Sequence, residues 1–274
     1  MINILMCGNS AAFDGILMTA LSIVKHTDRE LKIFVATMDL TDEDESFSPV
    51  SQANIELLDS VIKEKNPRSE ATLLDFGDYY RESLKDSKNK DSRYTPFAML
   101  RLFADRDSRI PDKILYLDND LLLSGDIGEL YDIDISGYDL AGAKDHYGKV
   151  FINPKYINSG VLLLNMKRIR ESGIFKSSVE LCMNKKMLLP DQSAINKYAK
   201  RKLFLPARFN EQHKNKKDTL IRHFSMRIVW FPIFRTENIK PWHTELVHER
   251  LRLFCYDSIF ESFRKIKEKQ TSTK

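Results

Sequence analysis

The strongest constraint on the fold is an alternation of short apolar runs with helix-like stretches, which continues to about residue 205. Runs such as 161–164 are apolar on both faces, as strands of a parallel sheet are when helices cover both sides. Strands that alternate with helices predict an α/β fold with a parallel or mixed sheet. The predicted strands are 2–7, 31–37, 72–75, 114–117, 139–143 and 159–165, and the predicted helices are 14–25, 48–65, 96–104 and 191–200.

The composition excludes several classes of protein. The net charge is +4, from 43 basic and 39 acidic residues, whereas a nucleic-acid-binding protein would need a clustered excess of Lys and Arg. No run approaches the roughly 20 apolar residues that span a bilayer. The first residues lack a basic segment and a small-residue cleavage site, so they predict a strand and no signal peptide.

The cysteines indicate the redox compartment. Cys7, Cys182 and Cys255 are odd in number, far apart and outside any Cys-x-x-Cys motif. This pattern argues against a disulfide framework and against a thiolate zinc site. A reducing environment fits best, and we therefore expect a cytoplasmic location.

Three polar segments are predicted to lie at the surface. Residues 83–92 and 211–218 are charged and predict loops. The end of the chain, 261–274, carries five basic and two acidic residues. We favour a solvated helix end with a frayed tail there. The alternative is weak contact with an anionic membrane, at its inner face, because apolar residues precede the basic ones: Phe254, Ile259, Phe260 and Phe263.

Paired aspartates are the first candidate for chemistry. The pattern Asp-x-Asp occurs four times, at 42/44, 105/107, 118/120 and 132/134, so the pattern alone is not specific. Asp118 and Asp120 differ from the others because aliphatic residues flank them on both sides. Carboxylates in such a run are buried or half-buried, and an unpaired buried charge is costly.

The spacing of this pair suits a metal ion. In an extended segment, residues i and i+2 share a face, so both carboxylates point the same way and Asn119 points away. Two oxygen ligands at the carboxyl end of a strand suit Mg²⁺ or Mn²⁺, and open α/β sheets bind ligands at that edge. The alternative is a turn whose acids cap backbone groups.

A histidine and a lysine near the end of the chain could complete such a site. His223 has apolar neighbours that predict a strand, where a histidine is more often a hydrogen-bonded core residue than a ligand. Mixed carboxylate and imidazole ligands would favour Mn²⁺ over Mg²⁺. Lys240 precedes a proline, which favours an extended backbone that can present the ammonium to a phosphate.

Three further segments stand out. Arg101 is the only charge in the apolar helix predicted after Thr95-Pro96, so its guanidinium needs a buried anion, either a protein carboxylate or a ligand phosphate. Asn158-Ser159-Gly160 precedes a strand and could form a turn or contact a sugar. Asp191 is placed to cap the helix that starts at Leu189-Pro190, but capping does not account for Gln192.

Together these segments resemble glycosyltransferase family 8, the retaining nucleotide-sugar enzymes that include bacterial lipooligosaccharide galactosyltransferases and glycogenin. The resemblance covers roughly residues 2–243, and the motifs occur in the order found in the family. They are Cys7-Gly-Asn, Tyr94-Thr-Pro-Phe-Ala-Met-Leu-Arg-Leu, Leu115-Tyr-Leu-Asp-Asn-Asp, Ile157-Asn-Ser-Gly-Val-Leu-Leu-Leu-Asn, Leu189-Pro-Asp-Gln, Arg208-Phe-Asn, His223-Phe and Lys240-Pro-Trp.

The resemblance implies a GT-A fold, a Rossmann-like mixed and mostly parallel sheet flanked by helices. It implies a catalytic domain over 1–243, followed by a helical basic extension over 244–274. Asp118, Asp120 and His223 would hold Mn²⁺, with Mg²⁺ as the alternative, and the ion would also bind the two phosphates of the UDP-sugar donor. Lys240 would contact a phosphate.

The remaining implied roles concern the nucleoside and the sugar. Cys7 and Asn9 would line the uridine pocket, and Arg101 and Asn119 would belong to the donor site. Residues around the transferred sugar would be Asn158, Asp145, Asp191 and Gln192, with Gln192 nearest the anomeric carbon. Members of the family often carry a tyrosine after the first strand, to stack on uracil, and here only Phe13 is near.

The sequence thus predicts a metal-dependent retaining transferase that moves glucose or galactose from a UDP-sugar to a glycan or glycoconjugate acceptor of the cell surface. The first alternative is a sugar-phosphate nucleotidyltransferase, which would usually have a glycine-rich phosphate loop after the first strand. The second is a glycan-binding relative without catalysis, which would not require the metal ligands.

Overall fold

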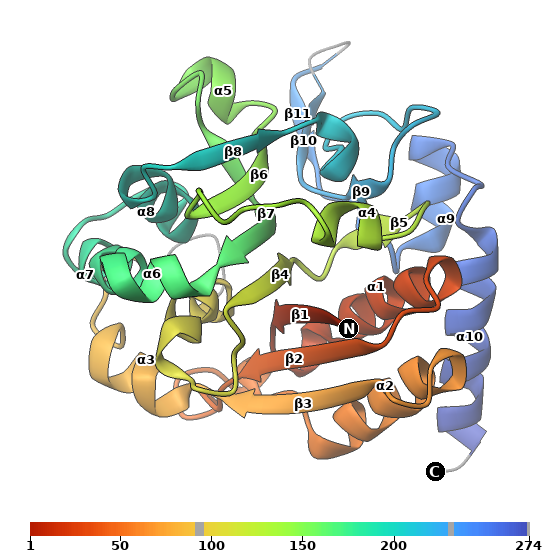
Figure 1. Ribbon diagram of the computed structural model, residues 1–274. Coiled ribbons are helices and arrows are strands. Elements are labelled where there is room, and N and C mark those ends of the chain that lie inside the picture. Colours follow the sequence, from red (N-terminus) through yellow and green to blue (C-terminus); the bar gives the residue numbers. More distant parts are fainter. Residues whose placement is uncertain (91–95, 230–232, 273–274) are drawn as a thin grey trace.

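The computed structural model describes residues 1–90, 96–229 and 233–272. A seven-stranded sheet with the order β3-β2-β1-β4-β7-β6-β8 forms its centre (Figure 1). All strands but β7 run in one direction, because β7 pairs antiparallel with both β4 and β6. The mixed, mostly parallel sheet is confirmed. Its strands are β1 (Ile2–Cys7), β2 (Leu31–Thr37), β3 (Glu70–Asp75), β4 (Lys113–Leu117), β6 (Leu140–Lys144), β7 (Ile157–Asn165) and β8 (Lys202–Leu205).

Helices cover both faces of this sheet, as its apolar strands require. Alternate residues of each central strand belong to two separate cores: Ile4 and Met6 of β1 face one core, and Leu5 and Cys7 face the other. The first core is covered by α1 (Phe13–His26), α2 (Gln52–Lys65) and α10 (Asp257–Ser272), and the second by α3 (Gly77–Ser83), the 3-10 helix η3 (Pro96–Arg106), α6 (Met166–Ser172), α7 (Ile174–Asn184) and α8 (Pro190–Tyr198).

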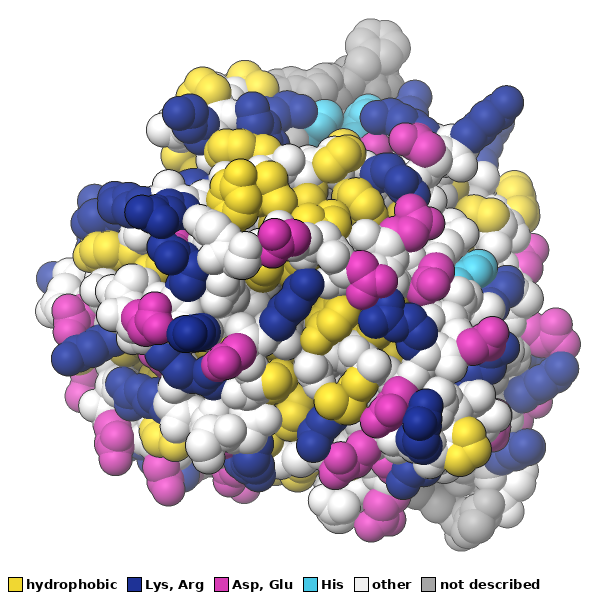
Figure 2. Space-filling view, in the orientation of Figure 1, with side chains coloured by type: hydrophobic (Ala, Val, Ile, Leu, Met, Phe, Trp, Pro, Cys, Tyr) yellow, Lys and Arg dark blue, Asp and Glu magenta, His cyan; other side chains and the backbone are white. Residues whose placement is uncertain are grey.

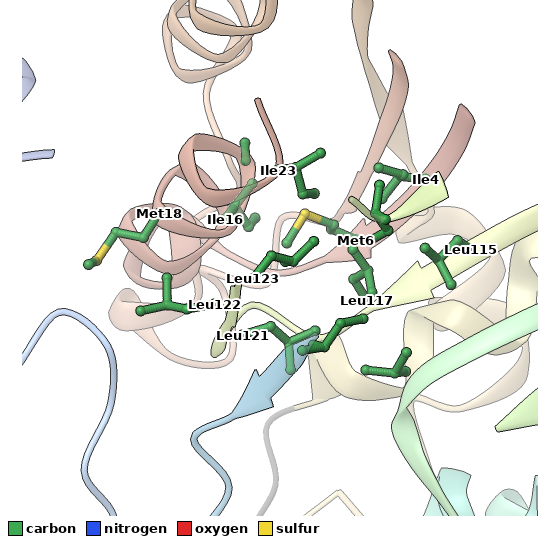
Figure 3. Packing of buried hydrophobic residues seen from close by; sticks show 14 of the residues in the cluster. Ile4, Met6, Ile16, Met18, Ile23, Leu115, Leu117, Leu121, Leu122 and Leu123 are labelled. Atoms are coloured by element: carbon green, nitrogen blue, oxygen red, sulfur yellow. The ribbon is translucent and has the colours of Figure 1, made fainter. Parts of the chain in front are cut away.

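A small second sheet extends the central sheet beyond the end of β4. Strand β5 (Leu121–Leu123) follows β4 after a short turn and pairs antiparallel with β9 (Ile221–His223), with Leu121 opposite His223. Figure 3 shows why the turn is held firmly, because side chains of β1, β4 and β5 pack together with those of α1. The register brings His223 next to the residues that link β4 to β5.

The other elements lie around this frame. They are η1 (Ser10–Ala12), η2 (Glu45–Phe47), α4 (Gly128–Tyr131), α5 (Gly148–Phe151), η4 (Ala207–Phe209), β10 (Arg227–Val229), β11 (Arg235–Glu237), α9 (Thr244–Leu246) and a π-helical turn, η5 (Val247–Leu251).

Several expectations need correction. The helix expected over 96–104 is a 3-10 helix that extends to Arg106, and Thr95 lies outside the described residues. The polar stretches 83–92 and 211–218 are not wholly surface loops, because Ser87, Asn89 and Glu211 are buried. Ser87 and Asn89 both donate to the carbonyl of Cys182, at 2.7 and 2.5 Å, and so anchor their segment to α7.

The carboxyl-terminal segment packs on the core. Ile259 and Phe260 of α10 are buried in the first core, and Lys267 of α10 pairs with Asp14 of α1 at 3.0 Å. Two of the apolar residues that suggested membrane contact are therefore covered by the protein, whereas Phe254 is exposed. Across residues 1–90, 96–229 and 233–272, no helix is both long and apolar enough to cross a bilayer. The division at residue 243 stays a prediction.

Helix α1 approaches the β4–β5 turn so closely that only glycine fits at residue 15. A Cβ there would lie 2.2 Å from the backbone oxygen of Asn119 and 2.6 Å from a ring atom of Trp242. We expect Gly15→Ala to lower the free energy of unfolding by about 1–3 kcal/mol, because the backbone must move. Urea denaturation measures this effect. Gly137→Ala is the control, since a Cβ at Gly137 meets nothing within 4 Å, and equal stability of both variants would contradict the close packing.

Candidate functional site

The site forms at the carboxyl end of β4, where the chain turns through Asp118, Asn119 and Asp120. The turn is held on both sides by backbone hydrogen bonds. The N–H of Asp118 donates to the carbonyl of Gly160 in β7 at 2.8 Å, and the N–H of Phe224 donates to the carbonyl of Asp120 at 2.9 Å. Strand β7 and the residue that follows β9 thus fix the positions of the two aspartates.

Asp118, Asp120 and His223 converge as a group that could hold a metal ion, with their ligand atoms within 4.8 Å of one another. His223 Nε2 lies 3.1 Å from Asp120 Oδ1 and 3.8 Å from Asp118 Oδ2. Gly160 makes room for this group, because a Cβ there would lie 2.3 Å from a carbon of the His223 ring and 2.8 Å from Asp118 Oδ2.

A chain of amide side chains determines which nitrogen of His223 carries the proton. The N–H of Gly160 can only donate, and it donates to Asn158 Oδ1 at 3.0 Å, while Asn158 Nδ2 donates to Asp145 at 2.8 Å. Asn158 Oδ1 also accepts from Asn210 Nδ2 at 2.9 Å. Asn210 therefore turns its oxygen toward His223 Nδ1, 3.0 Å away. Because that oxygen can only accept, the proton is on Nδ1.

The hydrogen bond at Nδ1 directs His223 Nε2 toward the two aspartates, and Nε2 lies 3.1 Å from the buried Asp120 Oδ1. The neutral imidazole would present a lone pair to a cation at this position. Neighbouring ligands of an octahedral Mg²⁺, each about 2.1 Å from the ion, are about 3 Å apart. The donor set and its spacing therefore fit a divalent cation.

Lys240 supplies the positive charge nearest to Asp120. Its ammonium donates to Asp120 Oδ2 at 2.5 Å and to the carbonyl of Phe224 at 3.2 Å. Burial by itself would raise the pKa of Asp120, but Lys240 and His223 together, through charge and hydrogen bonds, hold that pKa below its ordinary value. The Asp120 carboxylate is thus ionised and available as a ligand.

Arg101 of η3 lies on the other side of the turn and is fully buried. Its guanidinium donates to Asp118 Oδ1 at 2.9 Å and to the carbonyl of Ser159 at 2.6 Å, and its Nε lies 3.3 Å from Asp191 Oδ2. It also stacks over the ring of Tyr116, 3.9 Å from the centroid. The buried anion that Arg101 requires is therefore a pair of protein carboxylates.

The N-cap of the helix that carries Asp191 and Gln192 lies two residues earlier than expected. Leu189 is the N-cap of α8 and Pro190 its first residue, so Asp191 does not cap the helix. Its carboxylate instead faces Arg101, while burial raises the pKa of Asp191. Gln192 Oε1 accepts hydrogen bonds from the N–H of Ser159 at 2.8 Å and from its hydroxyl at 3.2 Å.

One hydrogen-bonded network joins most of the residues that the sequence singled out. Gln192 Nε2 donates to Asp145 Oδ2 at 3.3 Å, and Asp145 accepts from Asn158 in the chain that ends at His223. Ser159 connects Gln192 to Arg101 and hence to Asp118.

Three expected donor-site residues lie outside this network. Cys7 ends β1 close to Arg101, and burial raises the pKa of its thiol to about 12. Asn9 caps η1 by accepting from the N–H of Ala12 and donates to the carbonyl of Ser46. Asn119 Nδ2 lies 3.6 Å from where a Cβ on Gly8 would be. These residues border the site from the side of β1.

The sequence did not identify two residues that the network needs. Tyr116 donates its hydroxyl to Asp118 Oδ1 at 2.7 Å, and the available signal was its position two residues before Asp118, on the same face of an extended segment. Asn210 is 1% exposed and belongs to the Arg208-Phe-Asn motif, but no local pattern indicates its partners.

Comparison with known proteins places the chain in a family. The family model described as glycosyl transferase family 8 matches residues 3–245. A probable glycosyl transferase Gly of Streptococcus gordonii is 29% identical over 197 residues, which cover 71% of this chain and 26% of that protein. Lipopolysaccharide 1,2-glucosyltransferase of Escherichia coli K12 is 27% identical over 161 residues, 52% of this chain and 48% of that protein. The chain thus matches about half or less of the length of these relatives.

Solved structures show the same fold. The galactosyltransferase LgtC, in complex with donor and acceptor sugar analogues, superposes with a TM-score of 0.68 at 18% identity, over 96% of each chain. The glycosyltransferase GlyE of Streptococcus pneumoniae TIGR4 gives a TM-score of 0.64 at 20% identity, over 97% of this chain and 64% of that one. The fold is therefore that of the GT-A glycosyltransferases. With the family match over residues 3–245, the chain belongs to glycosyl transferase family 8.

Proposed function

We propose that this protein transfers a hexose, glucose or galactose, from a UDP-sugar to an acceptor hydroxyl, with retention of configuration and with the help of Mn²⁺ or Mg²⁺. The acceptor is a glycan or glycoconjugate of the cell surface. The observation that carries the proposal is the convergence of Asp118, Asp120 and His223, whose ligand atoms lie within 4.8 Å of one another at the end of β4. A diphosphate leaving group is the part of a nucleotide sugar that needs such a cation.

The metal-side residues have separate tasks. Asp118, Asp120 and His223 would hold the ion, which when bound neutralises the diphosphate and acts as a Lewis acid. In the structure, the ammonium of Lys240 forms an ion pair with Asp120. With a cation on that carboxylate, the ammonium can move to a donor phosphate as a point charge. Arg101 fixes Asp118 through a charge-assisted hydrogen bond.

The sugar-side residues would position the hexose. Asp145, Asn158 and Gln192 are buried, polar and linked to one another, so they can orient sugar hydroxyls with little reorganisation. Ser159 holds Gln192 Oε1 with two donors, and an amide oxygen held in this way is a weak nucleophile. We therefore favour attack by the acceptor on the same face from which UDP departs.

The relatives support the choice of substrates. LgtC is a galactosyltransferase studied with donor and acceptor sugar analogues, and the Escherichia coli relative is a lipopolysaccharide glucosyltransferase. Both hexoses therefore suit the proposal, as does an acceptor at the cell surface.

The metal assignment predicts the effect of Asp120→Asn. The variant should keep its fold but lose the metal-dependent part of UDP binding and lower turnover about 100-fold or more, because several kcal/mol of transition-state stabilisation is lost. Calorimetric titration of UDP with and without Mn²⁺ measures the first effect, and UDP-sugar hydrolysis the second. Asp42→Asn, at an exposed Asp-x-Asp pair, is the control. Wild-type turnover of Asp120→Asn would remove the metal assignment.

The assignment of Gln192 predicts a split between two measurements. Gln192→Ala should lower kcat about 100- to 1000-fold, as removal of a preorganised polar group at a reacting centre does, and change the Kd of UDP much less. Single-turnover kinetics and UDP titration give the two quantities. Equal losses in both would show that Gln192 is a donor-binding residue.

The amide chain predicts a role for Asn210 in metal affinity. Asn210→Leu removes the acceptor for His223 Nδ1–H, so Nε2 can take the proton. We expect the Kd of Mn²⁺ to rise about 10- to 100-fold, measured by the electron paramagnetic resonance signal of the free ion. Asn210→Asp keeps an acceptor for Nδ1 and should lose less affinity. Nitrogen-15 NMR of the imidazole reports the tautomer directly, and an unchanged Nδ1–H tautomer in Asn210→Leu would refute this role.

A further inference from the structure

An open groove of about 540 Å³ lies along β8, the edge strand of the central sheet. We call it the β8 groove, and its lining side chains are basic or aromatic: Tyr138, Lys155, Lys200, Arg201, Lys202 and Phe204. Figure 2 shows dark-blue Lys and Arg side chains gathered over the left-hand end of β8, beside yellow hydrophobic ones. No residue of the network around Asp118 lines this groove.

The β8 groove carries four positively charged side chains. Within the described residues, none of its four basic side chains forms an ion pair. Asp139 is buried, pairs with Arg168 and accepts from the backbone N–H groups of residues 200 and 201. Burial lowers the pKa of Lys202, and the charges of Lys200 and Lys155 lower it further. The cations therefore repel one another and would be stabilised by an anion.

The aromatic side chains add a second type of contact. Phe204 and Tyr138 are 38% and 37% exposed, so each offers a ring surface without projecting far from the protein. Lys144 lies over the Phe204 ring, 5.3 Å from its centroid, and is followed in the chain by Asp145 of the candidate site. Strand β8 pairs in parallel with β6, whose last residue is Lys144, so the edge strand runs toward the end of the sheet that carries Asp145.

We propose that the β8 groove binds an anionic glycan, one that carries carboxylate or phosphate groups, as a part of the acceptor distant from the reacting hydroxyl. The rings would pack on sugar faces, and the guanidinium and ammonium groups would bind the anions. The description of this glycan as the acceptor rests on the proposed function; the binding itself does not.

Two other occupants fit the β8 groove less well. A second copy of the chain, related by a two-fold axis, would place the same cations against one another. A bilayer surface would be contacted by projecting apolar side chains, whereas Phe204 and Tyr138 lie partly covered in a groove. An extended, polar and negatively charged chain matches both the shape and the charge.

The test uses tetragalacturonate, an acidic oligosaccharide, and its fully methyl-esterified form, which has the same sugars without charge. We expect calorimetry at low salt, with neither nucleotide nor metal, to show binding of the acid and at least ten-fold weaker binding of the ester. The double variant Lys200→Gln/Arg201→Gln should weaken binding of the acid about five- to thirty-fold, because it removes two cations that would each pair with a carboxylate of the glycan. Phe204→Ala should weaken it as well.

The matched control is Lys63→Gln/Lys65→Gln, which removes the same charge from α2 at the opposite edge of the sheet. It should bind like the wild type. Equal binding of acid and ester, or equal binding by the two double variants, would overturn the proposal. The proposal would also be overturned if the protein sediments with phosphatidylglycerol vesicles through Lys200 and Arg201 but does not bind tetragalacturonate.

The result does not depend on whether transfer activity is found. Asp120→Asn should bind tetragalacturonate like the wild type, because Asp120 does not line the β8 groove. If the wild-type protein binds tetragalacturonate but not UDP, only the proposed function is rejected. If it binds UDP but not tetragalacturonate, only the proposal for the β8 groove is rejected.

Discussion

The balance of buried charge at the end of β4 is the constraint on which the rest of the site depends. Three buried or half-buried carboxylates, Asp118, Asp120 and Asp191, meet two cations, Arg101 and Lys240. Charges removed from water must be paired, since an uncompensated one costs several kcal/mol. The two cations come from segments far apart in the sequence, so this pairing ties η3, α8 and the segment after β11 to one turn. The excess of one carboxylate leaves the site suited to a further positive charge.

Much of the fold could be predicted from the sequence, because the central strands are apolar on both faces. The bounds of β1 and β2 match the prediction residue for residue. Helices α6 and α7 were not predicted. They meet at Gly173, whose positive φ of 64° ends one helix and starts the next. Helix α6 has only seven residues, whereas the buried side chains of α7 recur with a helical period that was overlooked. The 3-10 geometry of η3 was also missed, because its apolar pattern resembles that of an α-helix.

From the sequence, the candidate site could be predicted only as a set of residue types that follow one another in a certain order along the chain. The position of Asp118 and Asp120 after a buried strand follows from local pattern, and the structure brings His223 to them through the β5–β9 register. The hydrogen-bond directions could not be inferred, because they depend on the N–H of Gly160 and on Asn210, which lie far apart in the chain. For the same reason the sequence assigned Asp191 a capping role, whereas Arg101 takes up its carboxylate.

The contact between Lys240 and Asp120 makes the ammonium a resident substitute for a metal ion. A divalent cation that enters the proposed site must compete with this internal ligand, so its apparent affinity reflects the difference between two ion pairs. The displaced ammonium then becomes available to the nucleotide, and the two ligands assist each other's binding through one side chain. Such an exchange would make binding of the cation and the diphosphate cooperative, so that the two tend to be bound together and released together.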